Sequence, residues 1–156
     1  MDSLALKSSR TSPGIRVRVD TMEHRRELEL LPNDEEYLNN TFNDWESLAC
    51  GRWILIHNFP IPSGFTVDKS TAAIQLSPAY PVTPLDMVYF YPPVLRSDGQ
   101  TIPCTQVTET IDGKGFQRWS RHYLPGSWHP NEDDLATHIM AIRDWLIRAM
   151  PEQVAV

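Results

Sequence analysis

Residues 80–84 read Tyr-Pro-Val-Thr-Pro, and residues 87–91 read Met-Val-Tyr-Phe-Tyr. Proline fixes its own backbone and pushes the preceding residue toward extended geometry, so the first stretch predicts an extended turn. The second stretch is rich in aromatic and β-branched side chains, which favour strands. Pro92 and Pro93 end it. This part of the chain therefore predicts a proline-shaped turn that leads into a strand.

Two further strands are predicted upstream of this turn. Residues 52–59 are rich in aromatic and β-branched side chains, and residues 71–77 alternate apolar side chains toward one face. A short helix is expected over residues 35–42, with Asp34 as its N-cap. Because the connections between the strands are short, the strands are expected to pair antiparallel.

Downstream of the turn, residues 95–127 show no regular period. Asp98-Gly99 and Asp112-Gly113 are turn signals within this segment. A long segment without helices or strands is uncommon in a compact domain and tends to be functional. We therefore expect 95–127 to be a long irregular segment that carries the site.

The C-terminal helix is the clearest predicted element. Its apolar side chains recur at helical spacing: Leu135, Ile139, Ile142 and Leu146. Pro151 ends it, and His138 is expected to face solvent. The elements together predict an α+β fold, in which an antiparallel β-meander of about four strands is packed by this helix.

Composition narrows the functions that are open to the chain. The formal net charge is −6 and the pI is about 5.3. An acidic protein is a poor general binder of nucleic acid, because phosphate contacts need clustered Lys and Arg. No apolar run matches a signal peptide or a membrane span, so a cytoplasmic protein without a membrane partner is expected.

The expected organisation is a disordered arm at residues 1–26, one domain at 27–150 and a short tail at 151–156. The start of the arm is dominated by small and polar residues without apolar periodicity. Five arginines at positions 10, 16, 18, 25 and 26 make the arm basic. We interpret that cluster as a solvated tail rather than a nucleic-acid arm.

Cys50 and Cys104 are the two cysteines of the chain. In a reducing compartment both are expected to be free thiols. No metal site is predicted, because the five histidines do not sit at metal-ligand spacing with these cysteines. Cys50 is interpreted as a packing residue at a strand start. A lone cysteine is most often a small buried hydrophobe, and the same alternative applies to Cys104.

Several short motifs resemble those of ubiquitin-conjugating enzymes. In that family a Tyr-Pro pair and a further proline precede the strand before the active site, as Tyr80, Pro81 and Pro84 do here. Trp128-His129-Pro130 is similar to the family's Trp-x-Pro segment, which leads into the next helix. The likeness covers roughly residues 33–148. It is greatest to the bacterial members, whose genes accompany ubiquitin-like and activating-enzyme-like proteins.

The resemblance implies a fold like that of ubiquitin-conjugating enzymes (UBC-like) and a thioester cysteine. Cys104 lies 24 residues after Tyr80, close to where the family places its nucleophile. His122, His129 and Asp98 are the possible supporting residues. The implied partners are a ubiquitin-like protein and an activating enzyme. No cofactor is implied, because ATP is used upstream and the chain has no Gly-rich phosphate loop.

The chain also departs from the family pattern. The family's His-Pro-Asn triplet, several residues before the cysteine, is replaced here by Val-Leu-Arg-Ser at residues 94–97. The resemblance therefore leaves two functions open. One is an enzyme that transfers a ubiquitin-like protein through Cys104, and the other is an inactive module that binds such a protein or a partner enzyme non-covalently. A small α+β domain with an unrelated role is a third alternative.

Overall fold

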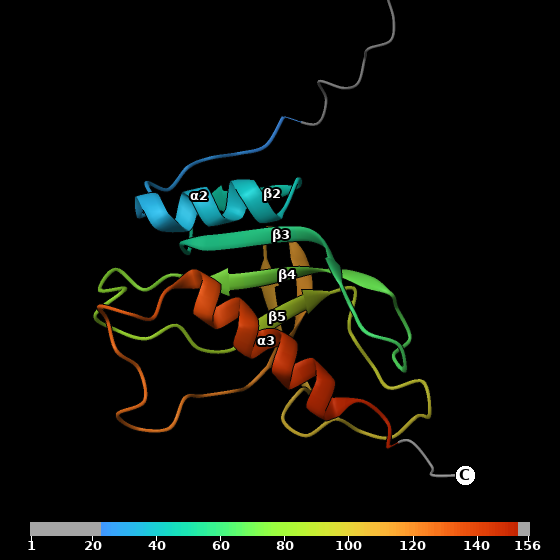
Figure 1. Cartoon of the computed structure of the whole chain (residues 1–156). Helices are drawn as coiled ribbons and strands as arrows, with labels where there is room; N and C mark the ends of the chain where they lie inside the picture. The colour runs from blue at the N-terminus through green and yellow to red at the C-terminus, as the bar shows by residue number, and fades with distance from the viewer. Residues whose placement is uncertain (1–22, 153–156) are drawn as a thin grey trace, which may run out of the picture.

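A computed structural model describes residues 23–152 of the chain. Two helices and six strands are assigned within these residues (Figure 1). In chain order they are α2 (Pro32–Thr41), β2 (Trp45–Leu48), β3 (Trp53–Pro60), β4 (Lys69–Gln75), β5 (Val88–Tyr91), β6 (Val107–Ile111), β7 (Lys114–Trp119) and α3 (Leu135–Ala149). The α+β class, the antiparallel strands and the C-terminal helix are thereby confirmed.

The described strands form one sheet in the order β2-β3-β4-β5-β7-β6, and every neighbouring pair is antiparallel. β2 to β5 are a meander, in which each strand pairs with the next along the chain. The β6–β7 hairpin then joins the edge at β5, with Val88 opposite Trp119. The predicted number of about four strands is too low, because β2 and this hairpin were not anticipated.

The expectation of irregular structure over residues 95–127 is wrong for the part that forms β6 and β7. β6 carries mostly exposed side chains and β7 contains Gly115, so neither gives an apolar alternation. The predicted turn at Asp112-Gly113 is present. Both residues have positive φ, 52° and 77°, which suits a two-residue hairpin connection.

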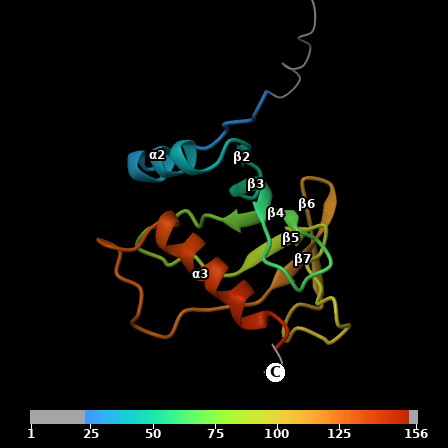
Figure 2. The same cartoon turned by 45° about the vertical axis from the view of Figure 1, so that its right-hand side comes forward.

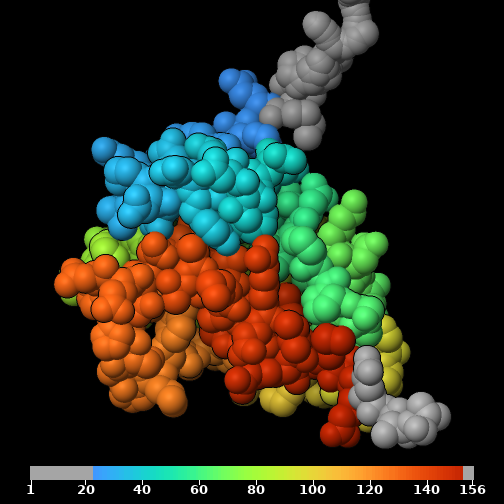
Figure 3. All heavy atoms as spheres, viewed as in Figure 1, coloured from blue at the N-terminus to red at the C-terminus, as the bar shows by residue number. Residues whose placement is uncertain are grey.

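One face of the sheet packs against both helices. Figures 1 and 2 show α3 crossing this face diagonally, and Figure 3 shows α2 lying directly beside α3. The predicted apolar stripe of α3 is confirmed, since all four of its side chains are buried. The expectation for His138 is wrong, because its side chain is fully buried on the same side.

The opposite face carries a second, smaller apolar cluster. Its buried members are Leu48, Trp53, Leu55, Ala73, Tyr89, Ile111 and Phe116. Strands of the meander and both strands of the hairpin contribute to this cluster. The sheet therefore has apolar side chains on both faces, and this is why β3 begins as a continuous apolar run rather than an alternating one.

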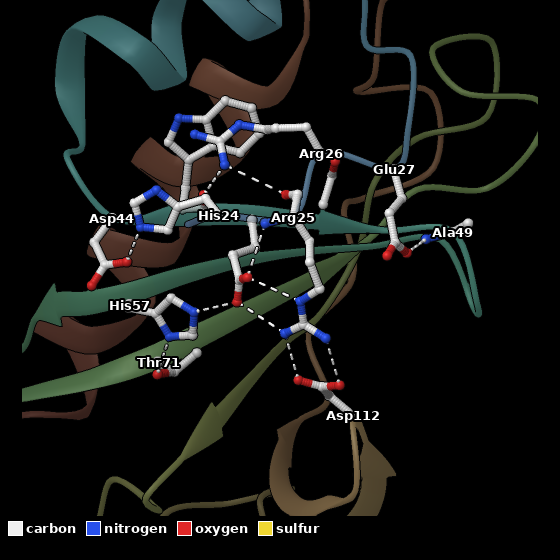
Figure 4. A network of polar contacts seen from close by, with 12 residues as sticks. His24, Arg25, Arg26, Glu27, Asp44, Ala49, His57, Thr71 and Asp112 are labelled. Atoms are coloured by element: carbon white, nitrogen blue, oxygen red, sulfur yellow. Dashed lines mark hydrogen bonds and ion pairs between the residues drawn. The ribbon is translucent and has the colours of Figure 1, made fainter. Parts of the chain in front are cut away.

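A segment before α2 lies against the free edge of β2. Ser47 N–H donates to the carbonyl oxygen of Arg25 at 2.9 Å, and Arg26 forms a parallel bridge with Ser47. Figure 4 shows the side chain of Arg25 reaching Asp112 in the hairpin turn. The remaining part of the expected arm, residues 1–22, and the last four residues of the expected tail lie outside the described residues. No helix among residues 23–152 is long and apolar enough to cross a membrane.

Two further sequence expectations need correction. Asp34 is not the N-cap of α2, because the helix begins at Pro32 and Asp34 is buried in its first turn. Cys50 is not a packing residue, because it is exposed in the turn between β2 and β3.

Candidate functional site

Cys104 lies in a turn between the loop after β5 and the start of β6. Its thiol is free and exposed, and its backbone has a φ of 61°. This left-handed conformation is uncommon for a residue with a side chain. The carbonyl oxygen of Cys104 accepts a hydrogen bond from Ser120 N–H at 3.0 Å. The cysteine is therefore fixed to the chain that leaves β7, while its side chain stays accessible.

Buried neighbours anchor the turn on both sides of Cys104. Ile102 and Thr105 are both buried, and the Thr105 hydroxyl donates to the Ile102 carbonyl oxygen at 2.8 Å. The Gln106 amide donates to the same oxygen at 2.9 Å. An exposed thiol between buried anchors is presented to solvent on a defined backbone rather than on a loose loop.

A buried glutamine holds the beginning of the same loop. Gln117 on β7 accepts from Val94 N–H at 2.8 Å and donates to the Val94 carbonyl oxygen at 3.2 Å. The indole N–H of Trp119 also donates to Gln117, at 3.0 Å. The role of Gln117 is not predictable from the sequence, since nothing local marks a glutamine on a strand as the anchor of a distant loop.

The predicted supporting residues take separate positions. His122 is exposed, with Nδ1 3.3 Å from an Asp86 carboxylate oxygen and Nε2 3.5 Å from the Ser120 hydroxyl. Asp98 pairs with Arg96 in its own loop, and this guanidinium lowers the pKa of the Asp98 carboxyl. Among the described residues, neither side chain makes a hydrogen bond or ion pair with Cys104.

His129 lies in the loop that leads to α3. Its backbone N–H donates to an Asp133 carboxylate oxygen at 2.7 Å, and its side chain is exposed. Pro130 follows it and is also exposed. This loop ends at Asp134, whose side chain accepts from Thr137 N–H in a capping box that begins α3.

The motif residues around Tyr80 connect three parts of the fold. The Tyr80 hydroxyl donates to the buried Asp34 carboxylate at 2.6 Å, and Leu135 N–H donates to the other oxygen of Asp34 at 3.2 Å. The indole N–H of Trp128 donates to the carbonyl oxygen of Pro81 at 2.8 Å. Tyr80 and Trp128 therefore fix the proline turn to α2, to α3 and to the loop before α3.

A groove opens between the proline turn and that loop. It has a volume of about 910 Å³ and lies between residues 77–86 and 122–128, with Leu76 and Leu85 among its lining side chains. Two large apolar side chains in these segments are mostly exposed, Val82 at 74 % and Leu124 at 79 %. Figure 3 shows the orange residues of the loop standing out from the body of the domain. Pro84 and His122 also line the groove.

The sequence matches the model of one known protein family, and this match decides which family the chain belongs to. A family model described as "Prokaryotic E2 family E" matches residues 30–149. The chain belongs to this family. A search of curated proteins and a search of solved structures return no match.

Membership of prokaryotic E2 family E confirms the resemblance to bacterial conjugating enzymes. It supports a conjugation-related role in general terms, and with it contact with an activating enzyme or a ubiquitin-like protein. The match extends from just before α2 to the last residue of α3, so it includes Cys104, the Tyr80 turn and the groove.

The structure of this E2-family chain adds a buried histidine beneath the groove loop. His138 Nε2 lies 2.9 Å from the Met87 carbonyl oxygen, and Nδ1 lies 2.6 Å from the Tyr123 hydroxyl. A neutral ring that donates to Met87 and accepts from Tyr123 satisfies both atoms. Burial lowers the pKa of His138 to about 4. This histidine holds the groove loop to the core.

Arg121 is the charged residue that the structure places beside the cysteine turn. Its Nη1 donates to the carbonyl oxygens of Pro103 at 3.2 Å and Ser120 at 3.0 Å. The guanidinium carbon lies 5.1 Å from the ring centre of Trp119. Burial lowers the pKa of Arg121, and the charge of Cys104 opposes that change. The position of Arg121 is not predictable from the sequence, because its partner Pro103 is 18 residues away along the chain.

Proposed function

We propose that this chain is a conjugating enzyme with a UBC-like fold for a ubiquitin-like protein, with Cys104 as its nucleophile. The observation that carries the proposal is an exposed, free thiol on an anchored turn in a member of an E2 family. The thiol follows the Tyr80 turn and the last strand of the meander. This is the order of features that the resemblance to ubiquitin-conjugating enzymes implies.

The proposed reaction has two acyl transfers. The Cys104 thiolate attacks the thioester carbonyl carbon of the carrier held by an activating enzyme, and a new carbon–sulfur bond forms. The bond to the activating enzyme's sulfur breaks, and that thiolate takes up a proton from solvent. An amine then attacks the Cys104 thioester, loses a proton and releases the Cys104 thiolate.

His122 is the proposed base for the second transfer. Its Nε2 lies 3.5 Å from the Ser120 hydroxyl, and Ser120 N–H donates to the Cys104 carbonyl oxygen, so His122 lies two residues from the contact that fixes the cysteine turn. Asp86, 3.3 Å from Nδ1, orients the ring. Asp98 and His129 hold loop geometry in this proposal rather than taking protons.

The groove is the proposed binding site for a segment of a partner protein. It begins at His122, next to the residues that contact the cysteine turn, and exposed apolar side chains flank it. An extended segment of a partner protein would bury Val82 and Leu124 on docking. We place the reaction in the cytoplasm, whose reducing conditions keep thiols free.

A non-covalent binding module is the second candidate. Two observations favour it: the His-Pro-Asn triplet is replaced at residues 94–97, and no histidine among the described residues contacts Cys104. In this case the groove would hold the partner and the thiol would be unused.

A charging assay separates the two candidates. The protein is mixed with a cognate activating enzyme, its ubiquitin-like protein and ATP, and the products are run on a non-reducing gel. A larger band that is removed by thiol, kept in Cys50→Ser and absent in Cys104→Ala supports the enzyme. The absence of this band, with an activating enzyme that is itself charged, would leave non-covalent binding as the function.

Cys104→Ala is a clean variant for this assay. The cysteine is exposed, and alanine has the same Cβ, so the cost of the positive φ is not changed by the substitution. We expect its melting temperature to stay close to that of the unsubstituted protein. Cys50 is equally exposed and is the matched control for the loss of a thiol.

A further inference from the structure

We infer that Arg121 is a catalytic residue that donates to the oxyanion formed when the Cys104 thiol exchanges an acyl group. The inference rests on the proposed function and deepens it, because it names a group that stabilises the transition state of both transfers. The His-Pro-Asn triplet of ubiquitin-conjugating enzymes has no counterpart at residues 94–97, so no asparagine from it is available as a donor. Acyl transfer still needs a hydrogen-bond donor at the oxyanion.

Two crossed contacts bring Arg121 to the cysteine. The side chain of Arg121 donates to the carbonyl oxygen of Pro103, the residue directly before Cys104. The backbone N–H of Ser120, the residue directly before Arg121, donates to the carbonyl oxygen of Cys104. The two short segments are thus joined in both directions. A guanidinium held by this pair of contacts stays at the carbonyl of the residue directly before Cys104.

The guanidinium keeps donors free for a ligand. Both of its hydrogen bonds use Nη1, and no acceptor among the described residues contacts Nε or Nη2. Trp119 beneath the guanidinium holds its plane, because a cation favours the face of an aromatic ring. Arginine is charged at every working pH and offers several N–H groups in a fixed plane. These are the properties that an oxyanion donor needs.

Two ion pairs engage other charged groups near the turn. On the cysteine's own loop, Arg96 and Asp98 are paired with each other. On the chain after β7, His122 is paired with Asp86. β6 begins three residues after the cysteine, and its first charged residue is Glu109. Arg118 on β7 lies opposite Val107, and its Nε has no partner among the described residues. Arg121 differs from it because its side chain donates to the cysteine turn itself, at Pro103, and still has donors to spare.

The inferred step keeps charge balanced. When the Cys104 sulfur bonds to the carbonyl carbon, the electron pair of the C=O bond moves onto oxygen. Arg121 donates to this oxyanion and releases it when the C=O bond re-forms and the other carbon–sulfur bond breaks. Removal of one oxyanion donor in other acyl-transfer enzymes costs about 10²- to 10³-fold in rate.

A pair of chemical reactions tests this role without any protein partner. Alkylation by iodoacetamide is a direct displacement and forms no oxyanion, whereas acylation by a small aryl thioester does. Both rates at Cys104 are measured in the Cys50→Ser background, so that one thiol reacts. We expect Arg121→Gln to slow acylation by at least roughly 10-fold and to leave alkylation within about twofold.

The matched control is Arg118→Gln, which removes an arginine from β7 close to the same segment. We expect both of its rates to match those of the parent. Arg121→Met keeps the aliphatic stem over Trp119 and replaces Arg121→Gln if the latter does not fold. Equal rates in the Arg121 variant and the parent, or equal losses of acylation and alkylation, would overturn the inference.

The outcome is separable from that of the charging assay. If the parent is not charged by an activating enzyme but its acylation depends on Arg121, the oxyanion role stands and the proposed conjugating function fails. If the parent is charged and acylation does not depend on Arg121, the conjugating function stands and the inference fails.

Discussion

Arg25 and Asp112 are 87 residues apart in the sequence, and their side chains meet through two hydrogen bonds, Nη1 to Oδ1 at 3.0 Å and Nη2 to Oδ2 at 2.8 Å. Arg25 precedes β2 at one edge of the sheet, and Asp112 lies in the hairpin turn at the other edge. The same guanidinium also bonds both oxygens of Glu46. One side chain therefore connects the two edges across the second apolar face.

The two carboxylates should contribute unequally to stability. Asp112→Asn removes only the exposed side of the contact and keeps a residue that tolerates the positive φ of the turn, so we expect a loss of about 0.5 kcal/mol. Arg25→Ala also leaves the Glu46 carboxylate, which is 9 % exposed, without its main partner. For that variant we expect a loss of about 2 to 3 kcal/mol.

Urea unfolding of the two variants and of the double variant measures these costs. A coupling energy near the small cost of Asp112→Asn is expected, because Arg25→Ala already removes that contact. Equal losses in the two single variants would contradict the larger role assigned to Glu46.

The contacts that escaped sequence analysis share a physical cause. β3, β4, β5 and the stripe of α3 follow from local periodicity. β2 is only four residues long and buried on both faces, including Glu46 and Ser47, so no alternation marks it. The environment of a polar side chain depends on residues far along the chain, as Arg25 with Asp112 illustrates.

The residues of the candidate site also differ in whether the sequence alone predicts their positions. The position of Cys104 follows from its spacing to the Tyr80 motif, because that motif fixes the turn and the strand before it. The roles of Gln117 and Arg121 do not follow, because their partners Val94 and Pro103 lie 23 and 18 residues away. A sequence shows which groups are present, but their convergence depends on the order of strands in the sheet.

His138 should make stability depend on pH in a defined window. Burial lowers its pKa to about 4 in the folded protein, and an unfolded histidine titrates near 6.5. Above pH 6.5 both states are neutral and this stability is fully present. As pH falls from about 6.5 to 4, His138 binds a proton in the unfolded chain but stays neutral in the folded chain. This should cost up to about 3 kcal/mol of stability.

His138→Gln tests this window, because glutamine can still donate to Met87 and accept from Tyr123 but does not titrate. Unfolding free energies at pH 7 and pH 4.5 should differ less in this variant than in the parent. An unchanged difference would show that other groups cause the acid sensitivity in this range.

The hydroxyl of Tyr80 should contribute to the stability of the fold through its hydrogen bond to Asp34. Tyr80→Phe removes the donor at 2.6 Å from the Asp34 carboxylate, which is 2 % exposed and keeps only Leu135 N–H. Burial raises the pKa of the Asp34 carboxyl, and the loss of a donor would increase that effect. We expect a loss of about 1 to 3 kcal/mol.

Tyr91→Phe is the control, because it removes the same atom from a side chain that is 39 % exposed and is expected to cost little. Thermal melts of both variants give the comparison. If Tyr80→Phe has the same melting temperature as Tyr91→Phe, water satisfies the Asp34 carboxylate and Tyr80 stabilises the fold through its ring alone.

Under the proposed conjugating function, Arg121→Lys should transfer the carrier to the protein's own residue 121. Three of the 14 basic residues are lysines, at positions 7, 69 and 114, and Lys69 lies on β4 while Lys114 lies in the β6–β7 hairpin. Arginine beside Cys104 supplies positive charge without a nucleophilic amine, whereas a lysine in its place brings an ammonium group that can lose its proton and attack the thioester. Charging of this variant should produce a thiol-resistant band with the carrier attached to residue 121, identified by mass spectrometry after proteolysis.

Arg118→Lys places a lysine on β7 away from the crossed contacts and should keep a thiol-sensitive band. A fully thiol-sensitive band from Arg121→Lys would place residue 121 out of reach of the thioester carbon, and Arg121 would then lie too far away to donate to its oxyanion.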